Sequence, residues 1–272
     1  MNYLLAILAG LIQGVAEFLP ISSSGHLVLL HEILRFNLPD NLTFDVVLHL
    51  GTFSSLLVFF WRDIIRLIKG FFSSLVKWNL NGDSNQRLAW LIIIGTIPAV
   101  LAGYFFNDFI EQVFHEGRSA ALVVAIMLIV VAVLFWLLEK YAKRLRAAES
   151  LKWWESLIIG AAQATALIPG TSRSGITICA GLMLKLTREQ AAKFSFLLSL
   201  PVVLGAGVKS LLQIESLTVA EWPLLAVGFV TAAVSGYFAV KFLLKYLLDH
   251  SLGVFAWYRV ILAGLILLWL VF

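Results

Sequence analysis

The sequence predicts an all-α polytopic membrane protein: six transmembrane helices plus two re-entrant helix-loop-helix hairpins, arranged as an inverted-topology repeat. Of the 272 residues, 61% are hydrophobic and 13% are charged. A soluble domain has about 45 to 50% apolar and about 25% charged residues, so this chain lacks the charge to cover a water-exposed surface. The mean hydropathy of +0.94 agrees. We therefore expect a single integral membrane domain over residues 1–272.

The composition also excludes several classes of site. The formal net charge of +4 does not indicate a nucleic acid partner, because basic residues of membrane proteins gather in cytoplasmic loops. One cysteine, Cys179, excludes an internal disulfide and a zinc site built on several cysteines. Residues 3–19 are not expected to be a cleavable signal peptide, since they lack a basic lead-in and contain Glu17.

Six apolar segments are long enough to cross the hydrocarbon as helices, which takes about 20 residues. They are 44–61, 88–106, 119–138, 194–212, 223–243 and 253–272. Basic residues crowd into 62–87, 139–152, 185–193 and 241–245. The positive-inside rule places these loops in the cytoplasm, and the remaining loops, 36–43, 107–118 and 213–222, are expected to face outward.

Two further apolar stretches, 3–35 and 153–186, are each interrupted by a cluster of proline, serine and glycine. The clusters are 20–26 (PISSSGH) and 169–175 (PGTSRSG). Each half is too short to cross, and irregular backbone at membrane depth is tolerated only where it is buried in protein or lines a wet cavity. We therefore expect two re-entrant hairpins.

The chain resembles itself at a shift of 150 residues. Without a gap, the shift pairs identical residues at 10 and 160, 13 and 163, 22 and 172, 24 and 174, and 25 and 175. This predicts one repeat over about 1–110 and a second over about 151–260. An outer loop follows the first hairpin and an inner loop follows the second, so the repeats are inverted, and such repeats place a site where the broken segments meet.

The two hairpins contain most of the polar groups at membrane depth, where such groups are functional candidates. Glu17, His26 and Arg173 supply a carboxylate, an imidazole and a guanidinium. Around them lie the hydroxyls of Ser22, Ser23, Ser24, Thr171, Ser172, Ser174 and Thr177. A guanidinium can hold two phosphate oxygens, and helices starting after Gly25 and Gly175 would offer N–H groups. The set therefore suits an oxyanion, with phosphate favoured.

Each of these residues also has a structural interpretation. A hydroxyl nucleophile needs a neighbouring base, and either Glu17 or His26 could reach Ser23. Alternatively, the serines serve close helix packing, Glu17 and Arg173 form a structural pair, and His26 is a hydrogen-bonded core histidine. Asp45 and His49, on one face of the next span, are either supporting groups of the site or interfacial.

The string 13–26 (QGVAEFLPISSSGH), together with 169–175, resembles the two signatures of the bacterial undecaprenyl-diphosphate phosphatase or bacitracin-resistance family. The resemblance extends over essentially the whole chain, including 194–196 (FSF), Tyr258 and Arg259. It implies hydrolysis of undecaprenyl diphosphate to undecaprenyl phosphate and phosphate, which recycles the lipid carrier of cell-wall synthesis and confers bacitracin resistance. It also implies a divalent cation, Mg²⁺ or Ca²⁺, and a site serving the outer, periplasmic face of the bacterial inner membrane.

The resemblance implies roles for named residues. Either Ser23 or His26 is the nucleophile; we favour Ser23, with Glu17 as its base or as a metal ligand, His26 protonating the leaving phosphate, and Arg173 stabilising the transferring group. Substrate-binding residues would be Gln13, Ser22, Ser24, Gly25, Thr171, Ser172, Ser174, Gly175 and Thr177. The family's first motif has Glu or Gln, three residues, then Glu, and here Gln13 takes the first place, so the motif supplies one carboxylate, Glu17, for a metal. A cation held by Glu17 and substrate oxygens is still consistent with magnesium chemistry.

Two other classes of membrane protein have features in common with this sequence. Membrane acid phosphatases with a Ser-Arg, five residues, His element are excluded, because Cys179 stands six residues after Arg173 where their histidine is required. A lipid flippase or ion-coupled transporter is the alternative, since inverted repeats with broken helices are typical of transporters. The expected partners are a polyprenyl diphosphate lipid, the membrane and a second copy in a homodimer, with no nucleic acid.

Overall fold

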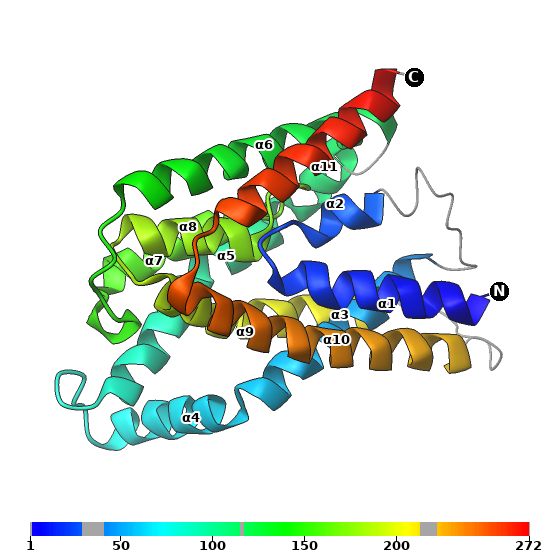
Figure 1. Cartoon of the computed structure of the whole chain (residues 1–272). Coiled ribbons are helices and arrows are strands. Elements are labelled where there is room, and N and C mark those ends of the chain that lie inside the picture. The colour runs from blue at the N-terminus through cyan, green and yellow to red at the C-terminus, as the bar shows by residue number, and fades with distance from the viewer. Residues whose placement is uncertain (1, 29–40, 115–116, 213–221, 272) are drawn as a thin grey trace.

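The computed structural model describes residues 2–28, 41–114, 117–212 and 222–271, and these ranges are helical with short connections (Figure 1). The longer helices are α1 Asn2–Phe18, α3 Asn41–Phe59, α4 Trp61–Val76, α5 Ser84–Phe114, α6 Gly117–Tyr141, α7 Trp153–Thr165, α9 Arg188–Leu212, α10 Trp222–Asp249 and α11 Gly253–Val271. The shorter ones are α2 Ser23–Val28, the 3₁₀ turn η2 Ala148–Ser150 and α8 Arg173–Met183. The predicted all-α class is confirmed for the described residues.

Five of the described helices are long and apolar enough to cross a membrane. These are α6, α9, α10, α11 and the part of α5 over Ser84–Phe106. The remaining predicted span, 44–61, corresponds to α3, which is followed by a bend of 76° into α4. Counting this bent pair as one span gives six. The predicted outer loop 107–118 is mostly helical, because α5 continues to Phe114.

Helix α4 lies where the sequence predicts a cytoplasmic loop. Ile65, Ile68 and Phe72 recur at helical spacing and are 41%, 51% and 61% exposed, while Gly70 and Ser74 are buried. A side chain at Gly70 would collide with the backbone at Asn85, so α4 packs closely on the start of α5. A search for uninterrupted apolar runs misses such a helix, because its charged residues divide the apolar ones.

Both Pro-Ser-Gly clusters are breaks between helices, and the two breaks have the same local geometry. The first break, between α1 and α2, contains Ser22 with φ 75°, and the second, between α7 and α8, contains Ser172 with φ 68°. The Ser22 hydroxyl accepts from the Gly25 N–H at 3.3 Å, and Ser172 accepts from Gly175 at 3.2 Å. These serines therefore cap α2 and α8, which begin two residues before the glycines rather than after them.

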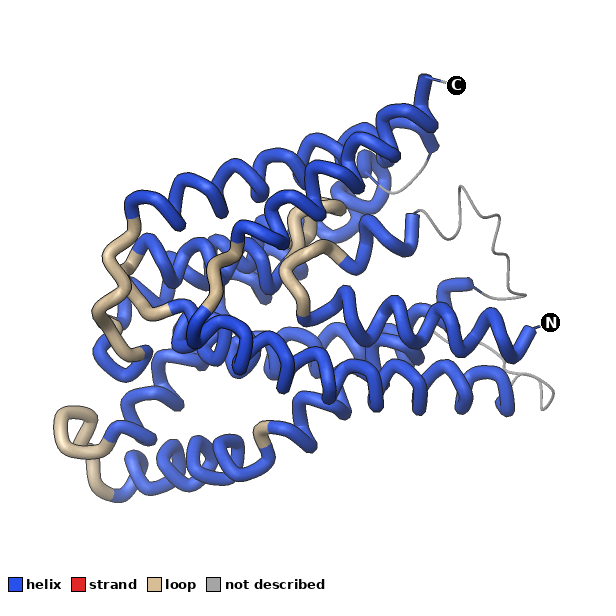
Figure 2. Tube along the Cα trace, in the orientation of Figure 1, coloured by secondary structure: helices blue, strands red, loops and turns tan. Residues whose placement is uncertain are grey.

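The helices pack in pairs that position the breaks inside the molecule. Helix α1 lies along α10, α7 along α5 and α6 along α11 (Figure 1). Glycines allow close contact in two of these pairs, because a Cβ on Gly10 would meet the Gly228 carbonyl oxygen and a Cβ on Gly160 would meet that of Gly95. Figure 2 shows the loops after α1 and α7 meeting in the interior.

The connections predicted to be cytoplasmic lie at one end of the helix bundle (Figure 2). The connections α4–α5, α6–α7 and α10–α11 gather at one end (Figure 2). At this end Glu139 pairs with Arg144 and Arg188 and also accepts from the Leu252 N–H. By the positive-inside rule, this end is predicted to face the cytoplasm. The predicted outer loops 36–43 and 213–222 lie mostly outside the described residues.

Candidate active site

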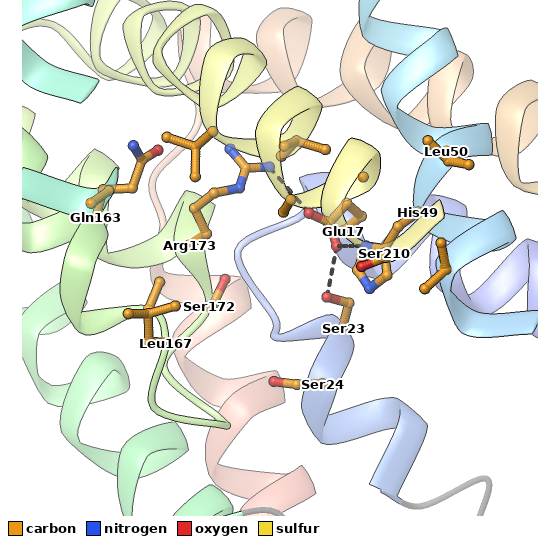
Figure 3. Close-up of a pocket in the computed structure, with 17 residues that line it drawn as sticks. Glu17, Ser23, Ser24, His49, Leu50, Gln163, Leu167, Ser172, Arg173 and Ser210 are labelled. Carbon is orange, nitrogen blue, oxygen red and sulfur yellow. Dashed lines mark hydrogen bonds and ion pairs between the residues drawn. The ribbon is translucent and has the colours of Figure 1, made fainter. Parts of the chain in front are cut away.

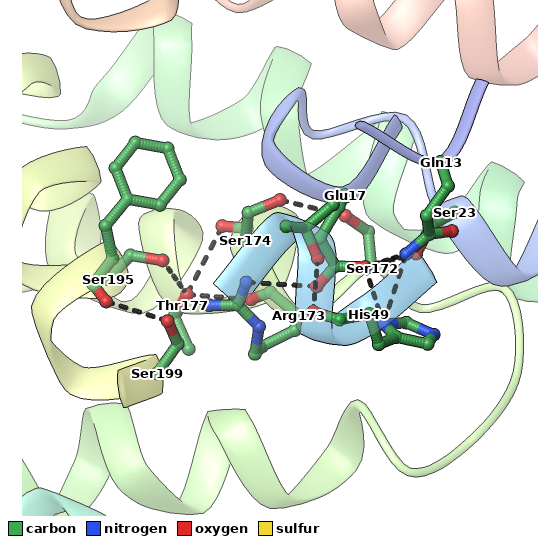
Figure 4. A network of polar contacts seen from close by, with 12 residues as sticks. Gln13, Glu17, Ser23, His49, Ser172, Arg173, Ser174, Thr177, Ser195 and Ser199 are labelled. Carbon is green, nitrogen blue, oxygen red and sulfur yellow. Dashed lines mark hydrogen bonds and ion pairs between the residues drawn. The ribbon is translucent and has the colours of Figure 1, made fainter. Parts of the chain in front are cut away.

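Glu17, in the last turn of α1, connects the two hairpins. Its Oε2 accepts hydrogen bonds from the Ser23 hydroxyl at 2.8 Å and from the Gln13 amide at 3.1 Å. Its Oε1 pairs with Nη2 of Arg173, at the start of α8, at 3.2 Å. The ring nitrogen Nδ1 of His49 lies 3.6 Å from Oε2 (Figure 4). A hydroxyl and a guanidinium therefore meet at one carboxylate, which is the candidate base for the hydroxyl.

A cavity of about 350 Å³ opens beside this carboxylate (Figure 3). Its polar lining consists of Glu17, Ser23, Ser24, His49, Gln163, Ser172, Arg173 and Ser210. Its apolar lining consists of Val46, Leu50, Ala99, Ala166, Leu167, Val202, Val203, Ala206 and Gly207. The polar groups of this lining that come from the two hairpins are called here the polar end of the cavity, and they share the cavity with apolar side chains of α3, α5, α9 and the segment just after α7.

Unpaired polar atoms concentrate at the polar end. Among the described residues, five buried side-chain atoms have no hydrogen-bond partner in the protein. Four of them are Oε1 of Gln13, both amide atoms of Gln163 and Nη1 of Arg173. A buried polar atom without a partner costs about 1 to 3 kcal/mol, so this concentration indicates a site that a polar ligand completes.

Five of the sequence-predicted site residues line the cavity: Glu17, Ser23, Ser24, Ser172 and Arg173. Gln13 is buried behind it, against Glu17 and His49. The remaining hydroxyls and glycines shape the loops. Thr171 bonds to the Ile168 carbonyl, Ser174 to the hydroxyl of Ser172, and Thr177 to the Arg173 carbonyl and to Ser195, while Gly25 and Gly175 donate to the capping serines Ser22 and Ser172.

His26 is oriented differently from the prediction that it reaches Ser23 or a leaving group. Its Nδ1 lies 2.7 Å from the Ser22 carbonyl oxygen, which can only accept, so Nδ1 carries the proton. Nε2 of the neutral ring then accepts from the Tyr258 hydroxyl at 2.6 Å. The two rings are stacked, and His26 is absent from the cavity lining. Both nitrogens are engaged away from Ser23, so the structure favours a role in holding the first loop.

Arg259, in α11, holds the two loops of the site in place. The sequence identifies it only as part of the family resemblance and assigns it no role. Its side chain is fully buried, and it donates to the carbonyls of Pro20 in the first loop and of Gly170 and Thr171 in the second. It also donates to the carbonyls of Met127 and Leu128 in α6. One guanidinium therefore joins the two loops across more than 140 residues of sequence, which no local pattern reveals.

Comparison with known proteins identifies relatives along nearly the whole chain. The family model described as bacitracin resistance protein BacA matches residues 6–265. A protein of Thermomicrobium roseum is 42% identical, over 98% of each chain. A protein of Alcanivorax borkumensis is 43% identical, over 99% of this chain and 100% of its own, and one of Trichlorobacter lovleyi is 44% identical, over 96% and 94%. All three are named undecaprenyl-diphosphatase.

Proposed function

The chain belongs to the bacitracin resistance protein BacA family, and from this premise we propose that the cavity beside Glu17 is its active site. The protein hydrolyses undecaprenyl diphosphate to undecaprenyl phosphate and inorganic phosphate, and so returns the lipid carrier to cell-wall synthesis and confers bacitracin resistance. The observation that carries the site assignment is the 2.8 Å hydrogen bond from Ser23 to Glu17, because a hydroxyl paired with a carboxylate base is an activated nucleophile.

In the first step, Oγ of Ser23 attacks the terminal phosphorus. Its proton passes to Oε2 of Glu17 as the new O–P bond forms. The bond from phosphorus to the bridging oxygen breaks, and undecaprenyl phosphate leaves with the electron pair. The leaving group is itself a phosphate, which carries the negative charge without a proton donor, so this step does not need His26.

In the second step, water attacks the phosphoserine. One proton of the water goes to a phosphate oxygen, the O–P bond to Ser23 breaks, and Glu17 returns its proton to Oγ. Inorganic phosphate leaves, and the site is restored. Arg173 stabilises charge on the transferring group in both steps, through the Nη1 that has no protein partner.

A divalent cation, Mg²⁺ or Ca²⁺, fits this site only if the substrate supplies some of its ligands. The donor chemistry suits a hard cation, because the Glu17 carboxylate accepts from the amide nitrogen of Gln13, whose Oε1 has no partner among the described residues. The described residues contain no group of three or more His, Cys, Asp or Glu side chains that could hold a metal. Glu17 and Gln13 would hold the ion, which would neutralise charge on the diphosphate oxygens.

The apolar half of the cavity supports a lipid substrate. It is lined by Val202, Val203 and Ala206 of α9 and by Val46 and Leu50 of α3. Such a lining can accommodate the first isoprene units of a prenyl chain by burying their apolar surface. The diphosphate then lies at the polar end, against Ser23 and Arg173.

The inverted repeat is also part of the proposal. It is supported by the capping serines Ser22 and Ser172, which share a positive φ and the same hydrogen bonds at a spacing of 150 residues. Helices α1 and α7 enter the molecule from opposite ends (Figure 1). Repeats over about 1–110 and 151–260 account for both features.

The position of the cavity supports a site that serves the outer face. Helix α9 starts at the basic end with Arg188, and the cavity contacts its distal part, at residues 202–210. In α3 the contacts lie at 46–50, in the first half of the helix and away from its junction with α4. A cavity in the half opposite to the cytoplasmic loops opens toward the periplasm of the inner membrane. The homodimer stays a prediction.

Phosphate release by the purified protein in detergent tests this function. We expect inorganic phosphate to form from undecaprenyl diphosphate and from shorter prenyl diphosphates, and a chelator to slow the reaction. A flippase or transporter, which the broken helices also favour, would bind these lipids without releasing phosphate. Phosphate release absent from an otherwise folded protein contradicts the proposal.

A further inference from the structure

Gln163 is a buried side chain that has no hydrogen-bond partner among the described residues. It lies in α7, is 3% exposed and lines the cavity beside Arg173 (Figure 3). Neither its amide nitrogen nor its amide oxygen makes a hydrogen bond. Gln86, by contrast, is 4% exposed and fully engaged: its oxygen accepts from the Asn79 N–H, and its nitrogen donates to Ser73 and to the Lys77 carbonyl. Burial alone therefore does not explain the unpaired amide.

The comparison with Gln13 shows why Gln163 is unpaired. Gln13 occupies the corresponding position 150 residues earlier, and its nitrogen donates to Glu17, one helical turn further on. The residue one turn after Gln163 is Leu167, which cannot accept a hydrogen bond. The second hairpin thus keeps the amide but lacks the carboxylate that accepts from the amide nitrogen in the first. Its partner must come from within the cavity.

Arg173 defines the chemistry of that partner. Its Nη2 is held by Glu17, whereas its Nη1 is buried and unpaired. An amide N–H and a guanidinium N–H in one cavity are both donors, and anionic oxygens are the acceptors that such donors bind most strongly. The amide oxygen of Gln163 can in turn accept from a protonated phosphate oxygen.

We propose that Gln163 and Nη1 of Arg173 form a phosphate subsite, which holds the terminal phosphoryl group of the substrate and then the inorganic phosphate product. This assignment rests on the proposed function of the cavity. It gives the second hairpin a binding role, while the first hairpin supplies Ser23 and Glu17 for the chemistry. Inorganic phosphate alone is therefore a ligand of this subsite.

The test compares Gln163→Met with Gln86→Met in the full-length protein in detergent. Methionine keeps most of the volume and removes both polar atoms. For Gln163→Met we expect the KM for undecaprenyl diphosphate and the inhibition constant for inorganic phosphate to rise by about tenfold or more, while the Tm without phosphate is unchanged or higher. For Gln86→Met we expect a lower Tm with parental KM and phosphate inhibition.

Parental KM and parental phosphate inhibition in Gln163→Met would overturn the inference. Gln163→Glu is the second variant: it retains the shape but places a negative charge in the subsite, so phosphate inhibition should weaken further, and unchanged inhibition would also refute the subsite. The rise in Tm that inorganic phosphate gives the parent, and its loss in Gln163→Met, test the subsite without turnover. A parent that binds phosphate but releases none from the lipid would refute the proposed function and leave the subsite supported.

Discussion

At the scale of single residues, the site depends on how Glu17 divides its two oxygens. One accepts from Ser23 and the other pairs with Arg173. The sequence predicts that these three residues meet, because charged groups at membrane depth need partners. It does not predict where His26 points, since that depends on Tyr258, 232 residues further along the chain. Nor does it identify Gln163 as a ligand-facing amide, because its unpaired state depends on the packing around it.

Arg173→Lys tests whether the guanidinium binds phosphate or only neutralises Glu17. A lysine can preserve the ion pair with Glu17, but its ammonium cannot also extend a second, coplanar donor into the cavity. We expect kcat/KM to fall by at least about a hundredfold, with a Tm close to that of the parent. Steady-state kinetics and thermal unfolding in detergent measure the two quantities. Activity within a fewfold of the parent would show that Arg173 serves only the ion pair.

At the scale of elements, the length of the apolar runs predicts the long apolar helices, and the Pro-Ser-Gly clusters predict both breaks. The amphipathic helix α4 is missed because Arg62, Arg66 and Lys69 interrupt its apolar residues. The start of α8 is predicted three residues late, because Ser172, whose side chain accepts from the Gly175 N–H, caps the helix ahead of the glycine. Helix boundaries depend on such caps more than on hydropathy.

The start of α7 provides a prediction on pH dependence. Glu155 accepts from the backbone N–H of Lys152 at 2.7 Å and forms a two-point pair with Arg146 at 2.7 and 2.8 Å. The hydrogen bonds from Arg146 hold the pKa of Glu155 below its ordinary value of 4.5. A carboxyl whose pKa is lower in the folded state stabilises the fold above the ordinary pKa, and this stabilisation is lost as the pH falls through the folded-state value.

Glu155→Gln should therefore lower the Tm at pH 7 by about 2 to 6 °C. The difference from the parent should shrink as the pH is lowered below about 4.5. Thermal unfolding between neutral and acidic pH measures this, with Glu149→Gln in the preceding turn as the control. A Tm difference that is constant across the pH range would show that the charge of Glu155 does not stabilise the start of α7.

At the scale of the whole molecule, the sequence predicts the all-helical class with several apolar helices, and two further patterns predict the orientation and the inverted repeat. Basic residues mark one end of the bundle, and the shift of 150 residues relates the two hairpins. What it cannot supply is the packing that brings the hairpins together. The fully buried Arg259 joins Pro20 to Gly170, and the hydroxyl of Ser24 accepts from the Gly170 N–H at 3.1 Å. These contacts are between residues far apart in the chain.

Cysteine labelling tests the orientation of the molecule. In a Cys179→Ala background, Lys143→Cys lies in the basic α6–α7 connection, and Ser216→Cys lies in the loop 213–222 predicted to face outward. We expect an impermeant thiol reagent added to intact cells to label Ser216→Cys and not Lys143→Cys, because basic loops stay in the cytoplasm. Permeabilised cells, in which both should react, are the control. Labelling of Lys143→Cys in intact cells would reverse the orientation.

The proposed mechanism depends on Ser23 as the group that attacks phosphorus. Its most direct test is Ser23→Ala, with phosphate release from undecaprenyl diphosphate measured beside Ser54→Ala, a serine of α3 whose hydroxyl bonds only to the Gly51 carbonyl in the described part of the chain. We predict that Ser23→Ala binds the lipid with nearly parental affinity and releases no phosphate above background, because the hydroxyl is needed only for bond formation. Ser54→Ala should retain parental activity. Equal phosphate release by Ser23→Ala and the parent would contradict the mechanism and assign the attack to another group.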